Sequence, residues 1–184
     1  MFIQTETTPN PATLKFLPGL TVMEQGTADF RDIEKAKDGS PLAKRLFDIG
    51  GVSGVFFGSD FITITKDEGK EWYLLKPSIL GVIMEHFTAG RPVLSISKAG
   101  IENVESDDDE IVAQIKELLE TRVRPFVAQD GGDIVYHGFE DGIVSLTMQG
   151  ACAGCPSSTA TLKLGIENML KHYIPEVVEV QAVA

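Results

Sequence analysis

Apolar and polar side chains alternate at several places in the first 66 residues, which is typical of β-strands with one buried face. The alternation predicts five strands, at residues 2–6, 13–18, 20–25, 52–58 and 60–66. Ser40 followed by Pro41 predicts a helix start, because serine caps helix N-termini and proline fits the first helical position. We expect this helix to end near Asp48, before Gly50 and Gly51.

Apolar residues recur at helical spacing in three later segments. The first predicted helix covers residues 71–88, the second has apolar positions from Ile111 to Val123 and ends near Pro125 or a few residues beyond, and the third covers 156–173. Further strands are predicted at 133–139, 143–149 and 176–183. The first two of these form a hairpin around residues 140–142, so the second half of the chain has the order α-β-β-α-β.

These elements predict an α+β fold made of two small α/β domains. We place the N-terminal domain at residues 1–90 and the C-terminal domain at 107–184. The segment 91–106 between them contains Pro92 and Gly100 and runs into the acidic sequence ESDDDE, so we interpret it as a linker.

Composition excludes several classes of protein. Apolar residues make up 43% of the 184-residue chain, enough for an ordinary core, and no apolar run reaches the roughly 20 residues that span a bilayer. The N-terminal sequence has neither the basic segment nor the apolar stretch of a secretory signal. We therefore expect a cytoplasmic protein in a bacterium, or a mitochondrial matrix protein if the chain is a processed eukaryotic form.

The net charge of −11 is distributed unevenly. Residues 1–100 contain 11 basic and 12 acidic residues, whereas residues 101–184 contain 5 basic and 15 acidic residues. The second half therefore has a net charge of −10, which argues against a nucleic-acid partner or an anionic membrane surface.

Two cysteines, Cys152 and Cys155, are the only ones in the chain and lie in the sequence GACAGCPSST, between a predicted strand and a predicted helix. Pro156 is expected at the first helical position, which puts Cys155 at or next to the N-cap. Free N–H groups and the helix dipole stabilise a thiolate there. Small neighbours, Ala153 and Gly154, let the backbone approach a bulky ligand.

Three interpretations of this pair are open: two buried structural cysteines, a thioredoxin-like redox pair, and a metal or cluster site. Zinc sites and iron–sulfur clusters usually take four protein ligands, and no His, Asp or Glu lies within five residues of either cysteine. The aspartates Asp130 and Asp133 are interpreted as turn formers beside glycine. The histidines are scattered along the chain and lack ligand spacing: His86, His137 and His172.

A two-fold dimer would complete the ligand set, because it brings two copies of one loop together. A site made only by association is expected to be labile, which suits a carrier better than a permanent redox centre.

The sequences DGGDI and GACAGCPSST resemble the C-terminal domain of the NifU family, the Nfu domain, and QTETTPNPATLKFLPG resembles the Nfu N-terminal domain. The resemblance implies an iron–sulfur cluster scaffold or carrier that delivers [4Fe-4S] clusters, with Cys152 and Cys155 as the cluster ligands. It assigns no role to the TTPNP motif. The chain lacks the additional cysteine-rich domains of long nitrogen-fixation NifU proteins, so cluster assembly from free iron and sulfide is not expected.

We therefore predict a cluster carrier that is not an enzyme and binds one [4Fe-4S] cluster between the Cys152 and Cys155 pairs of a homodimer. A [2Fe-2S] cluster has the same ligand count and stays open. The expected partners are an upstream assembly scaffold and apo iron–sulfur proteins. The rival predictions are a zinc-bridged structural dimer and a thiol–disulfide oxidoreductase.

Overall fold

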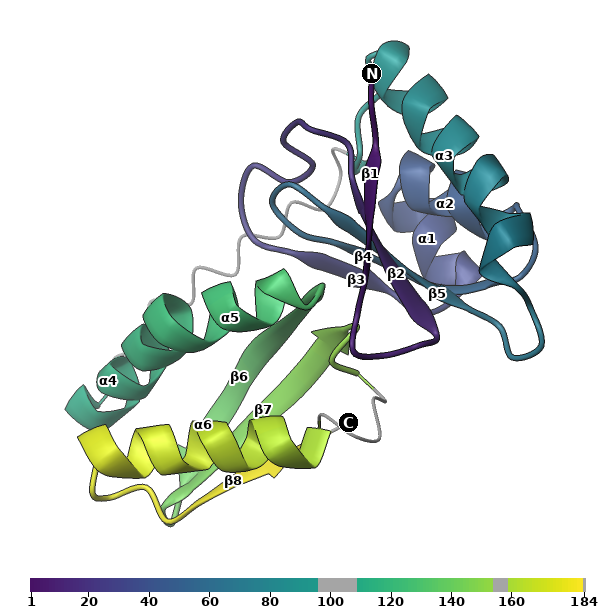
Figure 1. Cartoon of the computed structure of the whole chain (residues 1–184). Coiled ribbons are helices and arrows are strands. Elements are labelled where there is room, and N and C mark those ends of the chain that lie inside the picture. Colours follow the sequence, from purple (N-terminus) through teal and green to yellow (C-terminus); the bar gives the residue numbers. More distant parts are fainter. Residues whose placement is uncertain (96–108, 154–158, 184) are drawn as a thin grey trace. The chain divides into compact units, whose positions relative to one another are not determined.

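The computed structural model describes residues 1–95, 109–153 and 159–183. The chain divides into two compact units, Met1–Ile101 and Glu102–Ala184 (Figure 1). Each unit contains helices and strands, so the predicted α+β class is confirmed. None of the helices in the described parts of the chain is long and apolar enough to cross a membrane.

The N-terminal unit is an antiparallel sheet covered by helices on one face (Figure 1). Its elements are β1 (Gln4–Thr7), β2 (Thr13–Leu17), β3 (Ala28–Phe30), α1 (Ile33–Gly39), α2 (Pro41–Phe47), β4 (Val52–Phe57), β5 (Ile62–Lys66) and α3 (Trp72–Thr88). The strand order is β1-β2-β5-β4-β3, and every neighbouring pair is antiparallel.

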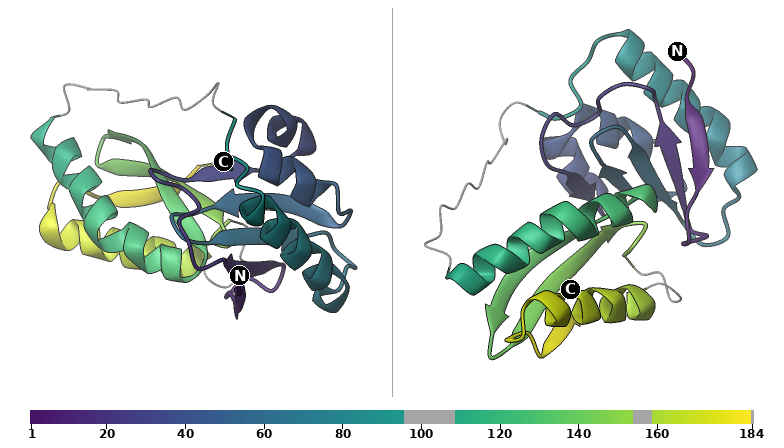
Figure 2. Two further views of the ribbon diagram at one scale, coloured as in Figure 1. Left: turned by 90° about the horizontal axis from the view of Figure 1, so that it is seen from above. Right: turned by 60° about the vertical axis from the view of Figure 1, so that its left-hand side comes forward.

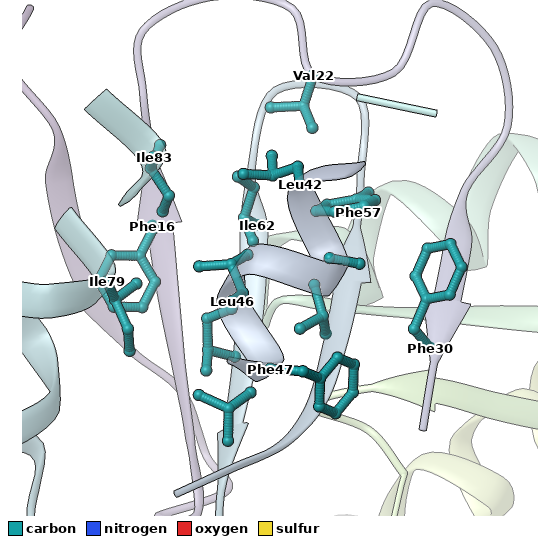
Figure 3. Close-up of a cluster of buried hydrophobic side chains, with 14 of the residues drawn as sticks. Phe16, Val22, Phe30, Leu42, Leu46, Phe47, Phe57, Ile62, Ile79 and Ile83 are labelled. Carbon is teal, nitrogen blue, oxygen red and sulfur yellow. The ribbon is translucent and has the colours of Figure 1, made fainter. Parts of the chain in front are cut away.

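The core of this unit lies between the sheet and its helices. Figure 3 shows Phe16 and Ile62 from the strands together with Leu42 and Leu46 of α2 and Ile79 of α3. All five side chains have 0% exposure. Full burial of such a side chain contributes about 1.5–3 kcal/mol, so this layer of contacts holds α2 and α3 on the sheet.

The predicted helix after Ser40 and the strands that form β1, β2, β4 and β5 are confirmed. The Ser40 side chain caps α2 by accepting a hydrogen bond from the Ala43 N–H at 3.0 Å. The strand predicted at 20–25 is wrong, because this segment is a loop. Val22 and Met23 are buried in the core, and both of their N–H groups donate to Ser59 O, so the apolar pattern reflects burial without strand pairing.

Two short elements, β3 and α1, were not predicted. The start of α1 has a capping signal that the sequence contains: the Lys35 N–H donates to Asp32 Oδ1 at 2.8 Å. The helix is only seven residues long, and Ala36 is its one buried residue, so its apolar pattern is too short to detect.

The TTPNP motif forms the turn between β1 and β2. Asn10 is 6% exposed, and its side-chain Oδ1 accepts from the Ala12 N–H at 3.1 Å. Its backbone oxygen accepts from the hydroxyls of Thr8 and Thr13, at 2.9 and 3.0 Å. Trp72 Nε1 donates to Pro11 O at 3.3 Å and so attaches the turn to α3. The motif therefore has a structural explanation within this unit.

The C-terminal unit is a three-stranded sheet with helices packed against one face. Its described elements are α4 (Glu110–Leu118), the π-helical turn η2 (Leu119–Val123), α5 (Arg124–Gln129), β6 (Gly132–Glu140), β7 (Ile143–Gly150), α6 (Thr159–Tyr173) and β8 (Glu179–Ala182). Strands β6 and β7 are antiparallel, and β8 is parallel to β7. Figure 2 shows the helical run α4–α5 along β6 and α6 beside β8.

Burial alternates along β7, where Val144, Leu146 and Met148 face the core. These side chains pack with apolar residues of the helices, namely Ile115, Leu119, Val123, Val127, Ile166 and Leu170. The predicted hairpin is confirmed, and it turns at Asp141 and Gly142, which both have positive φ. The first helical run reaches Gln129, a few residues past Pro125, while β8 is shorter than the strand predicted at 176–183.

The first residues of the predicted linker are hydrogen-bonded to the N-terminal unit. The Ser95 N–H donates to Gly39 O at 2.9 Å, and the Ser40 hydroxyl donates to Val93 O. His86 Nε2 lies 2.9 Å from Pro92 O, and it must be the donor because a carbonyl oxygen only accepts. Residues 96–108 lie outside the described residues, so the linker boundaries stay a prediction.

His86 has 0% exposure, and burial lowers the pKa of its imidazole. The hydrogen bond to Pro92 acts in the opposite direction, while the positive charges of Arg45 and Arg91 lower the pKa further. In the described parts of the chain, His86 Nδ1 has no hydrogen-bond partner. The folded N-terminal unit therefore favours the neutral form of this histidine.

This burial predicts a loss of stability in mild acid. As the pH falls through 6.5, the ordinary pKa of histidine, the unfolded chain binds a proton at His86 more readily than the folded chain, whose His86 pKa is lowered. The free energy of unfolding should fall by up to about 1.4 kcal/mol per pH unit in this window. The fall should be smaller in His86→Gln. Fluorescence of Trp72, the only tryptophan, measures unfolding of this unit.

His172→Gln is the matched control, because His172 is exposed and lies in the other unit. It should keep the wild-type dependence on pH. An equal dependence in wild type and His86→Gln would contradict the expectation.

Candidate functional site

Cys152 lies in the turn that follows β7, and its side chain is buried with 5% exposure. It belongs to the core cluster of the C-terminal unit. Residues 154–158 lie outside the described residues, and they include the second predicted ligand, Cys155, and Pro156, where the helix is predicted to start. The structure therefore places one of the two predicted site residues, and the pairing of the two stays a prediction.

Gly132, at the start of β6, lies directly against the Cys152 thiol. A Cβ atom added to Gly132 would be 2.4 Å from Cys152 Sγ and 2.9 Å from Gln149 O. Both distances are shorter than real Cβ contacts, so only glycine fits beside the thiol. The DGGD sequence therefore has a function in packing as well as in turning the chain.

A backbone hydrogen bond also joins the turn after β7 to the turn before β6. The Ala151 N–H donates to Gly131 O at 3.1 Å. Gly131 and Gly150 have φ of 79° and 63°, in the left-handed region that favours glycine. The cysteine turn and the DGGD turn thus support each other, although they are 20 residues apart in the sequence.

Asp133 is more than the turn former that the sequence predicted. Its side chain is buried, with 3% exposure for the residue, and accepts two hydrogen bonds from Arg124. Arg124 Nε and Nη2 lie 2.8 Å from Asp133 Oδ1 and Oδ2, and Arg124 Nη1 lies 2.6 Å from Glu120 Oε2. The hydrogen bond with Asp133 is the main reason why the pKa of Arg124 lies above its usual range, so the guanidinium stays charged.

The described residues do not collect further ligands around Cys152. His137 is exposed on β6 and hydrogen-bonded to Thr147, His172 is exposed on α6, and His86 belongs to the N-terminal unit. In the described ranges, no three His, Cys, Asp or Glu side chains come together as a metal-binding group. The ligand chemistry that the structure describes at this site is the thiol of Cys152.

Comparison with known proteins identifies the family. Residues 3–90 match the family model described as "Scaffold protein Nfu/NifU N terminal", and residues 115–181 match the "NifU-like domain". The human "NFU1 iron-sulfur cluster scaffold homolog, mitochondrial" is 55% identical over 184 residues, which cover all of this chain and 72% of that protein. The chain belongs to the Nfu/NifU scaffold family. The predicted resemblance and the order of the two Nfu domains are confirmed.

Two further relatives carry similar names. The "NFU1 iron-sulfur cluster scaffold homolog, mitochondrial" of Drosophila ananassae is 58% identical over 186 residues, covering 100% of this chain and 64% of that protein. The "NifU-like protein 4, mitochondrial" of Arabidopsis thaliana is 56% identical over 182 residues, covering 96% and 64%. This chain thus spans slightly less than two thirds of these Nfu proteins. Their names agree with the mitochondrial alternative for location and disagree with the cytoplasmic one.

The contact between Gly132 and Cys152 predicts the effect of a single methyl group. Gly132→Ala should move the Cys152 turn or destabilise the unit by about 1–3 kcal/mol, because neither the sulfur nor Gln149 O leaves room for Cβ. Urea unfolding measures the stability. The rate of Cys152 alkylation in a Cys155→Ser background measures the accessibility of the thiol.

Gly138→Ala on the same strand is the control, since its Cβ would have nothing within 4 Å. If Gly132→Ala matched this control in both stability and alkylation rate, the close contact would have no consequence.

Proposed function

We propose that this Nfu protein carries an iron–sulfur cluster and passes it to apo-proteins, without catalysing a reaction of its own. The observation that supports this most is the incomplete ligand set. The chain has two cysteines, and the described residues around Cys152 include no metal-binding group of three side chains. The names of the relatives as iron–sulfur cluster scaffolds support the same function.

A homodimer would supply the missing ligands. Cys152 and Cys155 from each of two chains give four thiolates, which is the number that a [4Fe-4S] cluster takes. A [2Fe-2S] cluster also takes four thiolates, so the ligand count favours neither. We propose the [4Fe-4S] form on the basis of the Nfu resemblance.

Transfer to an apo-protein would proceed by exchange of thiolates. In each step a recipient cysteine forms a bond to an iron atom, and the bond from that iron to Cys152 or Cys155 breaks. The proton lost by the incoming thiol is balanced by protonation of the released thiolate. No electron moves, so the exchange needs no oxidant or reductant.

The rest of the chain would serve this exchange. We propose that the N-terminal unit docks recipient proteins and that residues 91–106 link it to the cluster-binding unit. An upstream assembly scaffold would load the cluster. The mitochondrial names of the relatives favour the matrix as the location.

Anaerobic reconstitution with iron and sulfide tests the proposal. The wild type should gain about two iron and two sulfide per chain, half of a four-iron cluster, and should become a dimer. Cys152→Ser should gain neither, whereas His137→Gln should behave like the wild type because His137 lies on the exposed face of β6. Iron and sulfide analysis, sedimentation and Mössbauer spectroscopy measure these outcomes, and incubation with an apo-acceptor measures transfer.

Other results would replace the proposal. A dimer that contains zinc without sulfide would be a structural zinc-bridged dimer. Metal-independent turnover of disulfides that Cys155→Ser abolishes would show an oxidoreductase. A colourless monomer would leave no support for a carrier.

A further inference from the structure

Among the described residues of the C-terminal unit, the ion pair between Arg124 and Asp133 is more enclosed than those of Glu120, Lys163 and Lys171. The side chain of Asp133 is 4% exposed and that of Arg124 is 32% exposed. The distances from Arg124 Nε to Asp133 Oδ1 and from Nη2 to Oδ2 are both 2.8 Å. The contact is therefore bidentate, and each Asp133 oxygen accepts one N–H of Arg124. Glu120, one helical turn before Arg124, accepts a hydrogen bond from the remaining guanidinium nitrogen, Nη1, at 2.6 Å.

The ion pair closes the loop between α5 and β6, which contacts Cys152 through Gly132. Arg124 begins α5, and Asp133 is the second residue of β6. The turn between these elements contains Gly131, whose carbonyl accepts from the Ala151 N–H at 3.1 Å. Gly132 touches the thiol, since its Cβ would lie 2.4 Å from the sulfur. The ion pair thus fixes, one residue away, the backbone on which Cys152 rests.

Net stability is a weak reason for such a pair. Taking two charges out of water costs about as much free energy as their attraction returns, and apolar side chains of the same size often serve equally well. A bidentate contact does fix the orientation of the two side chains, because the planar guanidinium fits the carboxylate in one arrangement. The geometry of the pair therefore explains its presence better than its free energy.

We propose that Arg124 and Asp133 are positioning residues that hold the Cys152 thiol in place for cluster binding. This inference rests on the proposed function, and it assigns neither residue a contact with the cluster. A cluster held between two chains needs all four thiolates in place at once. If Cys152 is already fixed in the apo-protein, each chain loses less conformational freedom when the cluster binds. Preorganisation strengthens other complexes in the same way.

Three variants separate positioning from stability. Arg124→Met removes the guanidinium, and with it the positive charge and the two hydrogen bonds to the Asp133 carboxylate. The double variant Arg124→Met/Asp133→Leu replaces the pair by apolar side chains of similar size, which is expected to preserve folding. Arg124→Lys keeps the positive charge but cannot form the two parallel hydrogen bonds of a guanidinium. Lys171→Met is the control, because it breaks an ion pair of the same unit in which the basic residue, Lys171, is exposed.

The first measurement uses the apo-protein without any metal. In a Cys155→Ser background, Arg124→Met should raise the rate of Cys152 alkylation by iodoacetamide about tenfold, in line with other residues that orient a ligand through a second contact. The double variant should unfold at the same urea concentration as the wild type and still be alkylated about tenfold faster. Arg124→Lys should give an intermediate rate, and Lys171→Met should match the wild type.

The second measurement uses the reconstituted protein with both cysteines present. The two Arg124→Met variants should lose iron to a chelator about tenfold faster than the wild type and the Lys171→Met control. Alkylation does not depend on the cluster. A failed reconstitution would therefore count against the proposed function while the alkylation rates still decide whether the pair positions the thiol.

A double variant with wild-type stability and a wild-type alkylation rate would overturn the inference, since the ion pair would then serve folding alone. If the double variant does not fold, Arg124→Lys decides. A wild-type alkylation rate in Arg124→Lys would show that the two parallel hydrogen bonds are not needed and would also overturn the inference.

Discussion

The close contact between the Gly132 backbone and the Cys152 thiol is the constraint on which the turn after β7 and the start of β6 depend. A Cβ at the start of β6 would lie 2.4 Å from this sulfur, so any residue other than glycine would force its neighbours to shift. Gly132 follows from this constraint because it supplies the space, whereas Gly131 has a φ of 79°, in the left-handed region that favours glycine. The cysteine turn is therefore supported by backbone and is not free to take any position.

A basic residue of the acidic C-terminal unit forms an ion pair next to this contact. The second half of the chain has 15 acidic and 5 basic residues. One of those basic residues, Arg124, points to Asp133, which is the buried carboxylate of the described C-terminal residues. This ion pair adjoins the cysteine turn, because Asp133 follows Gly132, which contacts the Cys152 thiol.

The two units have separate hydrophobic cores. The N-terminal unit has its own core between sheet and helices, and its TTPNP motif is an internally hydrogen-bonded turn attached to Trp72. The C-terminal unit has a separate core that includes Cys152. Each unit therefore buries its own apolar residues in a core of its own.

The sequence by itself determined the α+β class, the β6–β7 hairpin, α2, α3 and the family, because these depend on local periodicity, caps and motifs. It could not distinguish the loop at 20–25 from a strand, since an apolar pattern reports burial and not the partner that causes it. Only the tertiary structure showed that Asp133 binds Arg124 and that Gly132 supports Cys152. Both contacts form when helix, strand and turn pack together, and spacing along the chain does not encode that packing.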